Sequence, residues 1–248
     1  MALRRFRADL HIHTCLSPCG ELTMYPRAVV EKARAAGLDI IAVTDHNSAE
    51  NAAAVGEAAA GTGLAVLPGL ELATEEEAHI LGLFEAGTAL GELLAIVYEK
   101  LPDIPSKRSF IDDQVIVDAE DCVTGFNPHC LIGATRLTVY EAVDLIHRHG
   151  GMAVASHVDR EAFSIISQLG FIPPDLKLDA VEVSPLLSFD EARAAFGPLS
   201  PFPLVRFSDA HRPEEIGRAS MDFFLAKPTL EEIRKALAGR DGREVRPA

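Results

Sequence analysis

The segment Asp9-Leu10-His11-Ile12-His13, near the N-terminus, decides how the rest of the sequence is interpreted. Polar and apolar residues alternate in it, which is typical of a β-strand whose successive side chains point to opposite faces. On that pattern Asp9, His11 and His13 share one face, and Leu10 and Ile12 share the other. Two imidazoles on one face of a strand can bind the same metal ion, so the segment predicts a metal site.

Later segments repeat this arrangement, in which a histidine or a carboxylate stands at an end of an apolar run with strand character. They are Thr44-Asp45-His46, Gly69-Leu70-Glu71, Ala78-His79-Ile80, Ala155-Ser156-His157 and Phe207-Ser208-Asp209-Ala210-His211. Neutral imidazole and carboxylate are ligands for Zn, Mn and Fe. A single histidine of this kind is compatible with a hydrogen-bonded core position, but the recurrence of the pattern at strand ends indicates a shared metal cluster.

Hydrophobic patterning and turn residues predict strands that alternate with helices. The expected strands are 6–12, 38–43, 64–72, 79–84, 152–156, 180–183 and 204–207. The expected helices are 26–36, 51–60, 89–100, 138–149 and 229–237. This alternation indicates a parallel sheet. Because polar residues follow nearly every strand at its C-terminal end, we expect an α/β fold that closes into a TIM-like β/α barrel, in place of an open sheet.

Residues 1–248 are expected to form a single barrel domain. Within it, residues 101–137 contain several prolines and glycines without clear periodicity, and they predict an irregular insertion that contacts substrate. His129 lies in this insertion, where it could donate a hydrogen bond to a phosphate or to a leaving group.

The formal net charge of −14 argues against general nucleic-acid binding, which requires a basic surface. It does not exclude an anionic substrate, because bound metal ions would dominate the field in a site. The sequence has no apolar run long enough to cross a membrane and no apolar signal core, so we expect a cytoplasmic protein. The four cysteines, Cys15, Cys19, Cys122 and Cys130, are not spaced like a disulfide scaffold.

Taken in order, these segments resemble the motifs of the PHP (polymerase and histidinol phosphatase) metal-dependent phosphoesterases. The matching residues are His11-Ile12-His13-Thr14, Thr44-Asp45-His46, Glu71, His79, His157 and Ser208-Asp209-Ala210-His211. The resemblance runs from about residue 8 to residue 217, which is most of the chain. It implies a distorted seven-stranded β/α barrel of the PHP type that holds up to three metals.

The resemblance also assigns metal ligands in three groups. They are His11, His13, Glu71 and Asp209 for the first metal, Glu71 with His79 and His157 for the second, and His46 with His211 for the third. It implies that Glu71, Asp209 and His211 are catalytic, and that the cofactors are two to three divalent ions of Zn, Mn or Fe. Two metals about 3.5–4 Å apart can bind a phosphoryl group and generate hydroxide at neutral pH. Asp9 and Asp45 fit as acceptors that orient the ligating imidazoles.

Two positions depart from the family pattern. Where family members with a third metal have His or Asp a few residues after the first histidine pair, this chain has Cys19, whose thiolate is a good zinc ligand. Either Cys19 ligates the third metal, or the site is weak, or Glu21 substitutes. The segment His157-Val158-Asp159-Arg160 replaces the His-Pro-Gly-Arg of the nucleotide phosphatases, and Arg160 could bind a phosphate oxygen through a bidentate fork.

The sequence therefore predicts a metal-dependent phosphoric monoester hydrolase. Its expected partner is a small phosphorylated substrate, such as a nucleotide, a nucleoside bisphosphate or histidinol phosphate. A metal-dependent amidohydrolase is the first alternative, although Glu71, His79 and the Asp209/His211 pair exceed what a binuclear site of that kind needs. A non-catalytic barrel that keeps metals for stability or regulation is the second. The natural substrate does not follow from fold and ligands.

Overall fold

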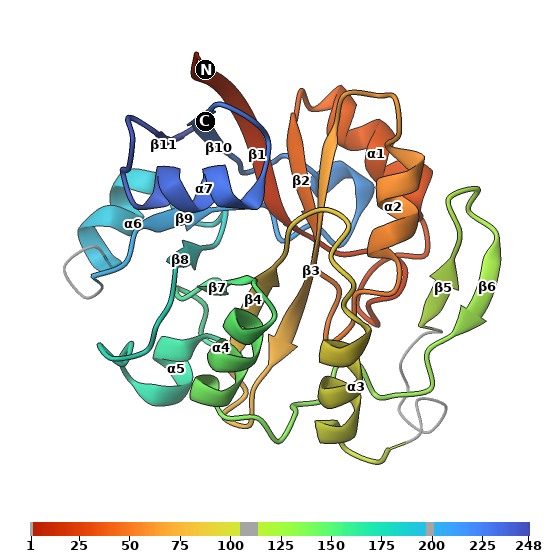
Figure 1. The fold of residues 1–248 in the computed structure, drawn as a ribbon. Coiled ribbons are helices and arrows are strands. Elements are labelled where there is room, and N and C mark those ends of the chain that lie inside the picture. Colours follow the sequence, from red (N-terminus) through yellow and green to blue (C-terminus); the bar gives the residue numbers. More distant parts are fainter. Residues whose placement is uncertain (1, 105–113, 197–200) are drawn as a thin grey trace.

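The computed structural model describes residues 2–104, 114–196 and 201–248 (Figure 1). The strands are β1 (Arg4–Ile12), β2 (Ile40–Val43), β3 (Ala65–Ala73), β4 (His79–Leu83), β5 (Val115–Val117), β6 (Val123–Phe126), β7 (Met152–Ala155), β8 (Ala180–Val183), β9 (Leu204–Arg206), β10 (Met221–Leu225) and β11 (Glu244–Pro247). The helices are α1 (Pro26–Ala35), α2 (Ala52–Ala58), α3 (Gly91–Lys100), α4 (Val139–Arg148), α5 (Ile165–Leu169), α6 (Phe189–Phe196), α7 (Leu230–Leu237) and a short 3-10 helix at Pro213–Glu215.

The helix ends follow local chemistry. Pro26 opens α1, and Gly37, with φ +71°, follows its end because glycine tolerates the left-handed conformation. Thr138 begins α4 with a capping box, in which its hydroxyl accepts from the Glu141 amide while the Glu141 carboxylate accepts from the Thr138 amide. The expected helix boundaries therefore agree with the observed ones to within about two residues.

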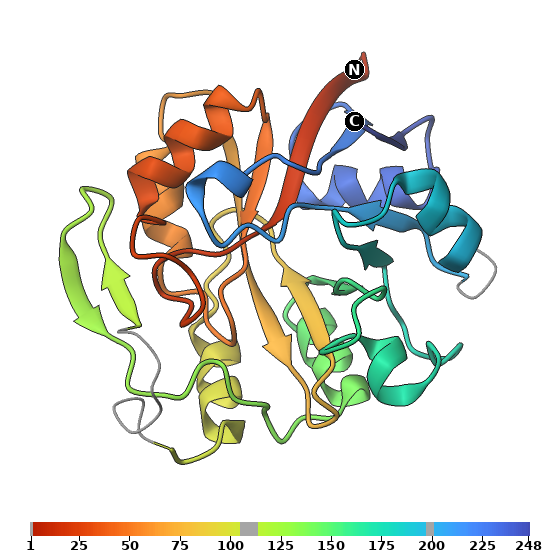
Figure 2. The ribbon, with the colours of Figure 1, turned by 180° about the vertical axis from the view of Figure 1, so that it is seen from behind.

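The main sheet forms a nearly closed barrel. Its strand order is β11-β10-β1-β2-β3-β4-β7-β8-β9. The chain beyond β9 then returns to β1, where the amide of His13 donates to the carbonyl of Ala210 at 2.9 Å and the Ala210 amide donates to the carbonyl of His11 at 3.2 Å. Figure 2 shows this blue segment beside the red β1. The ring from β1 to β9 confirms the expected barrel, and β10 and β11 extend it beyond the predicted strands.

The ring is not wholly parallel, which corrects the expectation of a parallel sheet. Strand β4 pairs antiparallel with both β3 and β7. His79 is the first residue of β4, and because β4 runs antiparallel to its neighbours, His79 lies at the same end of the barrel as residues that follow the other strands. At Gly69 a Cβ would lie 2.6 Å from the carbonyl oxygen of Gly82, so β3 and β4 approach closely just before Glu71.

Side chains that point into the barrel form an apolar interior cluster, which includes Phe6, Leu67, Leu81, Val154 and Phe223. Because side chains alternate along a strand, further residues of the strands also point inward, and at one end of the barrel these residues are polar. We call them the polar layer. The polar residues two or four positions from an interior apolar one are Glu71 after Leu67, His79 before Leu81, Glu182 after Ala180 and Asp209 after Phe207. The helices α1 to α5 pack outside, against a second cluster on the other face of the strands.

The segment from Asp9 to His13 does not alternate as a regular strand. Its pairing with β2 shifts register between Asp9 and Ile12. Leu10 belongs to the interior cluster and Ile12 to the outer one, so the expectation that these two share a face was wrong. His11 and His13 nevertheless point to the same place, since their Nε2 atoms lie 3.2 Å apart.

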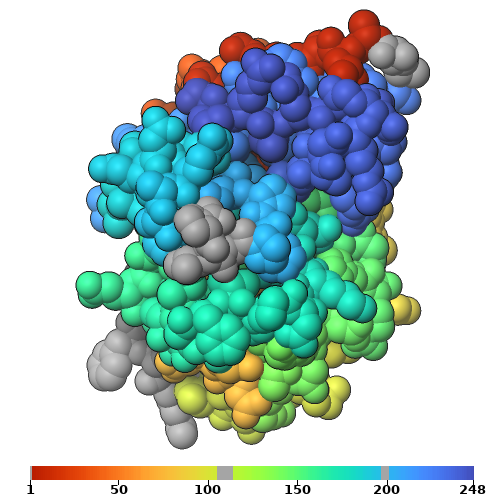
Figure 3. All heavy atoms as spheres, turned by 90° about the vertical axis from the view of Figure 1, so that its left-hand side faces the viewer, coloured from red at the N-terminus to blue at the C-terminus, as the bar shows by residue number. Residues whose placement is uncertain are grey.

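Helix α7 closes the apolar end of the barrel. Its residues Leu230, Ile233 and Ala236 belong to the interior cluster and pack against β10. Figure 3 shows α7 in blue on the surface of the molecule, beside the cyan α6. None of the described helices is long and apolar enough to cross a membrane.

Part of the expected insertion at 101–137 is regular. Strands β5 and β6 pair as an antiparallel hairpin, which stands at the edge of the molecule in Figure 1. Val115 and Val117 pack against Cys15, and the Asn51 side chain bonds the backbone of both valines. The hairpin thus supports the loop that follows His13. Residues 105–113 of the insertion lie outside the described part of the chain.

Candidate metal centre

One buried carboxylate stands at the centre of the polar layer. Glu71, near the end of β3, is 1% exposed, and imidazole nitrogens from four other segments surround its two oxygens. Those nearest to it are His46 Nδ1, His79 Nδ1 and His157 Nε2, each at 3.1 Å, His11 Nε2 at 3.4 Å and His13 Nε2 at 3.5 Å. The strand ends therefore bring together five of the histidines that the sequence singles out.

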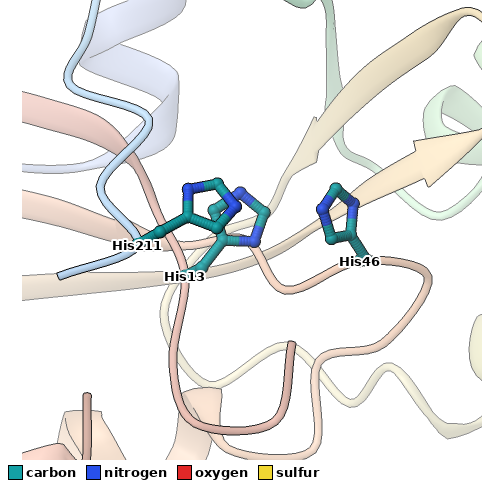
Figure 4. Close-up of side chains that lie close together, drawn as sticks. All are labelled: His13, His46 and His211. Atoms are coloured by element: carbon teal, nitrogen blue, oxygen red, sulfur yellow. The ribbon is translucent and has the colours of Figure 1, made fainter. Parts of the chain in front are cut away.

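Three sets of ligand atoms within this layer lie within 4.8 Å of one another. They are His11, His13 and Glu71, then His46, Glu71 and His79, and finally His13, His46 and His211. Figure 4 shows the last set, with the rings of His13 and His211 stacked at 4.1 Å and His46 facing them from the loop after β2. Each set is compact enough for one metal ion, and Glu71, His13 and His46 belong to two sets each.

Hydrogen bonds from neighbouring residues turn the free nitrogens of the first histidine pair inward. Nδ1 of His11 lies 2.9 Å from Oε2 of Glu182 on β8, and because a carboxylate accepts, the His11 Nδ1–H must donate. The Ser17 hydroxyl donates to Asp45 at 2.6 Å and accepts from Nδ1 of His13 at 2.9 Å. In the neutral form of each ring the unprotonated nitrogen is therefore Nε2, which faces the layer as metal ligation requires.

The two carboxylate oxygens of Asp209 have different neighbours. Oδ2 pairs with the Arg160 guanidinium at 2.6 Å. Oδ1 is buried without a hydrogen-bond partner, although it lies 3.3 Å from Nε2 of His11 and 3.2 Å from Nε2 of His13. A cation bound between this buried carboxylate oxygen and the two Nε2 atoms would satisfy all three of them. The donor set therefore fits a metal.

Two of the candidate ligands have a strained backbone. His157 has φ +26° and Asp209 has φ +49°, values that non-glycine residues rarely adopt. Such conformations persist where surrounding structure holds them, and they cluster at functional sites. The amide of His157 donates to Glu182, so the carboxylate that orients His11 also fixes this strained turn.

The protonation of the layer follows from burial and from its mutual contacts. Burial disfavours the charged form of Glu71, but the nearby imidazoles of His79, His11 and His46 outweigh it and hold the pKa of Glu71 well below its ordinary value. Burial and the neighbouring His211 lower the pKa of His13 well below its ordinary value. An ionised carboxylate beside a neutral imidazole is the state that binds metal.

Cys19 lies beside the third set of ligands. Its Sγ is 3.0 Å from Nε2 of His211. Burial opposes the thiolate, but hydrogen bonds from His211 and His46 lower the pKa of Cys19 from 9.0 to about 6. Glu21, the alternative to Cys19, is exposed and pairs with Arg212 at 3.2 Å. Of the two candidates, the geometry therefore brings only Cys19 to the layer.

The layer opens into a cavity of about 690 Å³. Its lining includes Cys19, Glu71, His211 and Arg160, so a substrate inside it would meet the layer directly. His129, the other expected substrate contact, does not line it. That ring stacks on Tyr98 at 4.4 Å in a separate cavity, and within the described part of the insertion only Ile132 reaches the first cavity.

Sequence reasoning missed Glu182 and Ser17. The signal for Glu182 was present, because a charged residue inside the apolar strand Ala180–Val183 must find a buried partner. Ser17 carried no signal. Asp9 and Asp45 were expected to contact imidazoles, but Asp45 acts through Ser17, and Asp9 accepts from the backbone amides of Ser208 and Gly217.

Solved structures share this fold. The endonuclease Q of Pyrococcus furiosus superposes with a TM-score of 0.69 at 20% identity, over 98% of this chain and 58% of that one. A complex of endonuclease Q with a 27-mer duplex carrying an abasic lesion gives 0.72 at 20% identity, over 97% and 58%. A two-domain protein of Bacteroides vulgatus with a predicted PHP-like metal-dependent phosphoesterase gives 0.58 at 18% identity, over 98% and 65%. The chain thus spans less than two thirds of these proteins.

The similarity to endonuclease Q corrects the expected partners. The sequence predicted a small phosphorylated substrate and no general nucleic-acid binding, and the argument rested on the net charge of −14. That expectation was wrong, because the fold is shared with a protein whose structure contains a DNA duplex at its active site. Net charge sums the whole surface, whereas the field at a metal site is set locally.

Sequence comparison agrees with the fold. An uncharacterized protein of Methanocaldococcus jannaschii is 28% identical over 185 residues, which are 71% of this chain and 80% of that protein. The model of the PHP domain matches residues 9–170, more than half of the chain and the part that contains all the ligand candidates except Asp209 and His211. The chain therefore belongs to the PHP domain family.

Proposed function

We propose that this protein is a metal-dependent phosphoesterase that cleaves a phosphoester of a nucleic acid. The observation that carries the proposal is the buried Glu71 carboxylate with five imidazole nitrogens within 3.5 Å of its oxygens. So many ligands around one carboxylate exceed the needs of a single ion. The fold of endonuclease Q, which accommodates a DNA duplex, supports the choice of substrate.

The proposed ligands are those of the three sets, completed by residues that lie against them. They are His11, His13, Cys19, His46, Glu71, His79, His157, Asp209 and His211, for two to three ions of Zn, Mn or Fe. When bound, such ions supply a nucleophile at neutral pH and polarise the phosphoryl group. We assign Glu71, Asp209 and His211 to catalysis, because each lines the cavity and contacts other ligands.

Residues around the polar layer hold the proposed ligands in fixed orientations. Glu182 and Ser17 fix the rings of His11 and His13, so neither must reorient when a substrate arrives. Arg160 holds one oxygen of Asp209 and is the only arginine or lysine among the described residues that line the cavity. Its side chain is 33% exposed, so it borders the space that a phosphate would occupy.

The test is a hydrolysis assay with the metal-reconstituted protein. The substrates are bis-p-nitrophenyl phosphate, p-nitrophenyl phosphate, a single-stranded oligonucleotide, and a duplex with one abasic site. We expect metal-dependent cleavage of the diester and of at least one nucleic acid, abolished by chelation. Cleavage of p-nitrophenyl phosphate alone would reject the nucleic-acid substrate and leave a phosphomonoesterase. No cleavage of any ester by protein with full metal content would reject the phosphoesterase itself.

A further inference from the structure

Apolar side chains gather at the mouth of the cavity, above the polar layer. Ile132 is 45% exposed, Phe163 48% and Leu186 83%. They come from three separate loops, after β6, β7 and β8, and all three line the same cavity. Single exposed apolar residues are ordinary on protein surfaces, whereas a cluster at a site indicates a contact with a ligand. We call these three residues the apolar rim.

Phe163 is held in place by the candidate ligand His79. The His79 amide donates to the carbonyl of Phe163 at 3.0 Å, and the two rings stack with centroids 5.0 Å apart and planes 15° apart. Phe163 also has φ +60°, a conformation that a bulky side chain rarely adopts without a surrounding constraint. The ring is thus fixed with one face toward His79, while about half of the residue remains exposed and lines the cavity.

We propose that the apolar rim binds a nucleobase of the substrate, stacked on Phe163, while the adjacent phosphate lies at the polar layer. This inference rests on the proposed phosphoesterase activity and names the group next to the scissile bond. A cavity of about 690 Å³ is larger than a phosphate needs and is in the range of nucleotide-sized ligands. An aromatic face recognises any base, because each base has a π-face of its own.

The polar groups near the apolar rim give no evidence for recognition of one particular base. Asp159, which lines the cavity, accepts hydrogen bonds from both the amide and the hydroxyl of Ser184, so its carboxylate is already engaged. Glu161 lines the same mouth and is exposed. Stacking therefore provides the contact with the base, and we expect binding that tolerates different bases.

Two esters with the same leaving group test this proposal. Thymidine 5′-(p-nitrophenyl phosphate) and methyl p-nitrophenyl phosphate share the leaving group and differ in carrying a nucleoside or a methyl group. The ratio of their kcat/KM values therefore reports what the nucleoside contributes, and the change of that ratio on replacing Phe163 reports the part due to stacking of the base. We expect the wild-type protein to prefer the thymidine ester about 10-fold or more, as one stacked base would produce. Phe163→Ala should lower that ratio about 10-fold, mainly through the KM of the thymidine ester.

Control variants separate stacking from a structural effect. Phe171 is 59% exposed and does not line the cavity, so Phe171→Ala should leave the ratio unchanged. Leu186→Ser removes a side chain too exposed to support folding, and it should lower the ratio as Phe163→Ala does. If Phe163→Ala slows both esters equally and preserves the ratio, Phe163 acts only through His79 and the proposal is overturned.

A binding measurement needs no turnover and distinguishes this proposal from the proposed function. Fluorescence quenching of 2-aminopurine deoxyribonucleoside 5′-monophosphate reports stacking directly. We expect its Kd to rise about 10-fold in Phe163→Ala and to stay unchanged in Phe171→Ala. Equal Kd values for Phe163→Ala and the wild-type protein would overturn the rim as a base site, whether or not the esters are hydrolysed.

Discussion

The Arg160 guanidinium lies 2.6 Å from Oδ2 of Asp209, and this contact leaves Oδ1 of Asp209 free to face His11 and His13. The sequence indicated that Arg160 could bind a phosphate, but the structure gives it a carboxylate of the polar layer as its partner. The arginine therefore orients a proposed metal ligand.

Replacing Arg160 tests this orienting role. Arg160→Ala removes the charge that stabilises the buried Asp209 carboxylate, so we expect metal affinity to fall about 10- to 100-fold, the usual range for residues that orient ligands. Arg160→Lys should lose less, because it keeps the charge without the planar fork. Competition with a chelator measures the affinity. Arg212→Ala, at an exposed arginine paired with Glu21, is the control. Unchanged affinity in Arg160→Ala would show that Asp209 needs no such partner.

Glu182 gives a second prediction, at the other side of the layer. Glu182→Gln keeps the volume of the side chain but removes the negative charge that accepts from His11 Nδ1 and from the His157 amide. We expect metal affinity to fall about 10-fold or more, with little change in thermal stability of the metal-free protein. Glu161→Gln, which changes an exposed carboxylate at the cavity mouth, should leave affinity as it is. Equal affinities in the two variants would count against an orienting role for Glu182.

The position of Cys19 leads to a prediction that absorption spectroscopy can test. Because its Sγ lies 3.0 Å from Nε2 of His211, we expect Cys19 to ligate the third metal with His46 and His211. Cobalt bound there should show a near-ultraviolet sulfur-to-cobalt charge-transfer band, and zinc should bind more tightly than manganese because thiolate is a soft ligand. The band should vanish in Cys19→Ala and persist in Cys15→Ala. Its persistence in Cys19→Ala would exclude thiolate ligation by Cys19.

Away from the site, the contacts of Glu232 lead us to predict that the stability of the folded protein depends on pH. Hydrogen bonds from Arg243 and from the amide of Ala226 lower the pKa of Glu232 from 4.5 to about 2. A lowered pKa stabilises the folded state above pH 4.5, and that stabilisation is lost as the pH falls from 4.5 toward 2. Metal-free Glu232→Gln should therefore melt about 2–4 °C below the wild-type protein at pH 7, the shift that ~1 kcal/mol produces at this size. A difference that stays constant down to pH 2.5 would contradict this linkage.

Local patterns in the sequence were sufficient for much of the barrel. Ala180–Val183 has the predicted strand bounds, and the recurrence of histidine after apolar runs correctly indicated one cluster. The direction of β4 could not be predicted, because nothing local distinguishes a strand that enters the ring antiparallel. His79 begins its strand, as the predicted bounds 79–84 have it, and it reaches the cluster because that strand runs antiparallel to its neighbours.

Contacts between residues that are distant in the chain could not be predicted from the sequence. Arg160 and Asp209 are far apart in the chain, and so are His11 and Glu182, and only the closure of the ring brings them together. His129 illustrates the converse, since its position in an irregular segment suggested a substrate contact, while the chain places it against Tyr98. Side-chain types indicated the chemistry of the cluster, but the tertiary structure decided which neighbours orient it.

Elemental analysis of the chelator-free protein measures the proposed metal centre most directly. We predict about two to three Zn, Mn or Fe ions per chain for the wild-type protein, as the ligand sets around Glu71 require. Glu71→Gln should hold at most about one, because adjacent cations then lose the carboxylate between them. Fewer than about one ion per wild-type chain, with none gained after incubation with these metals, would contradict the metal centre.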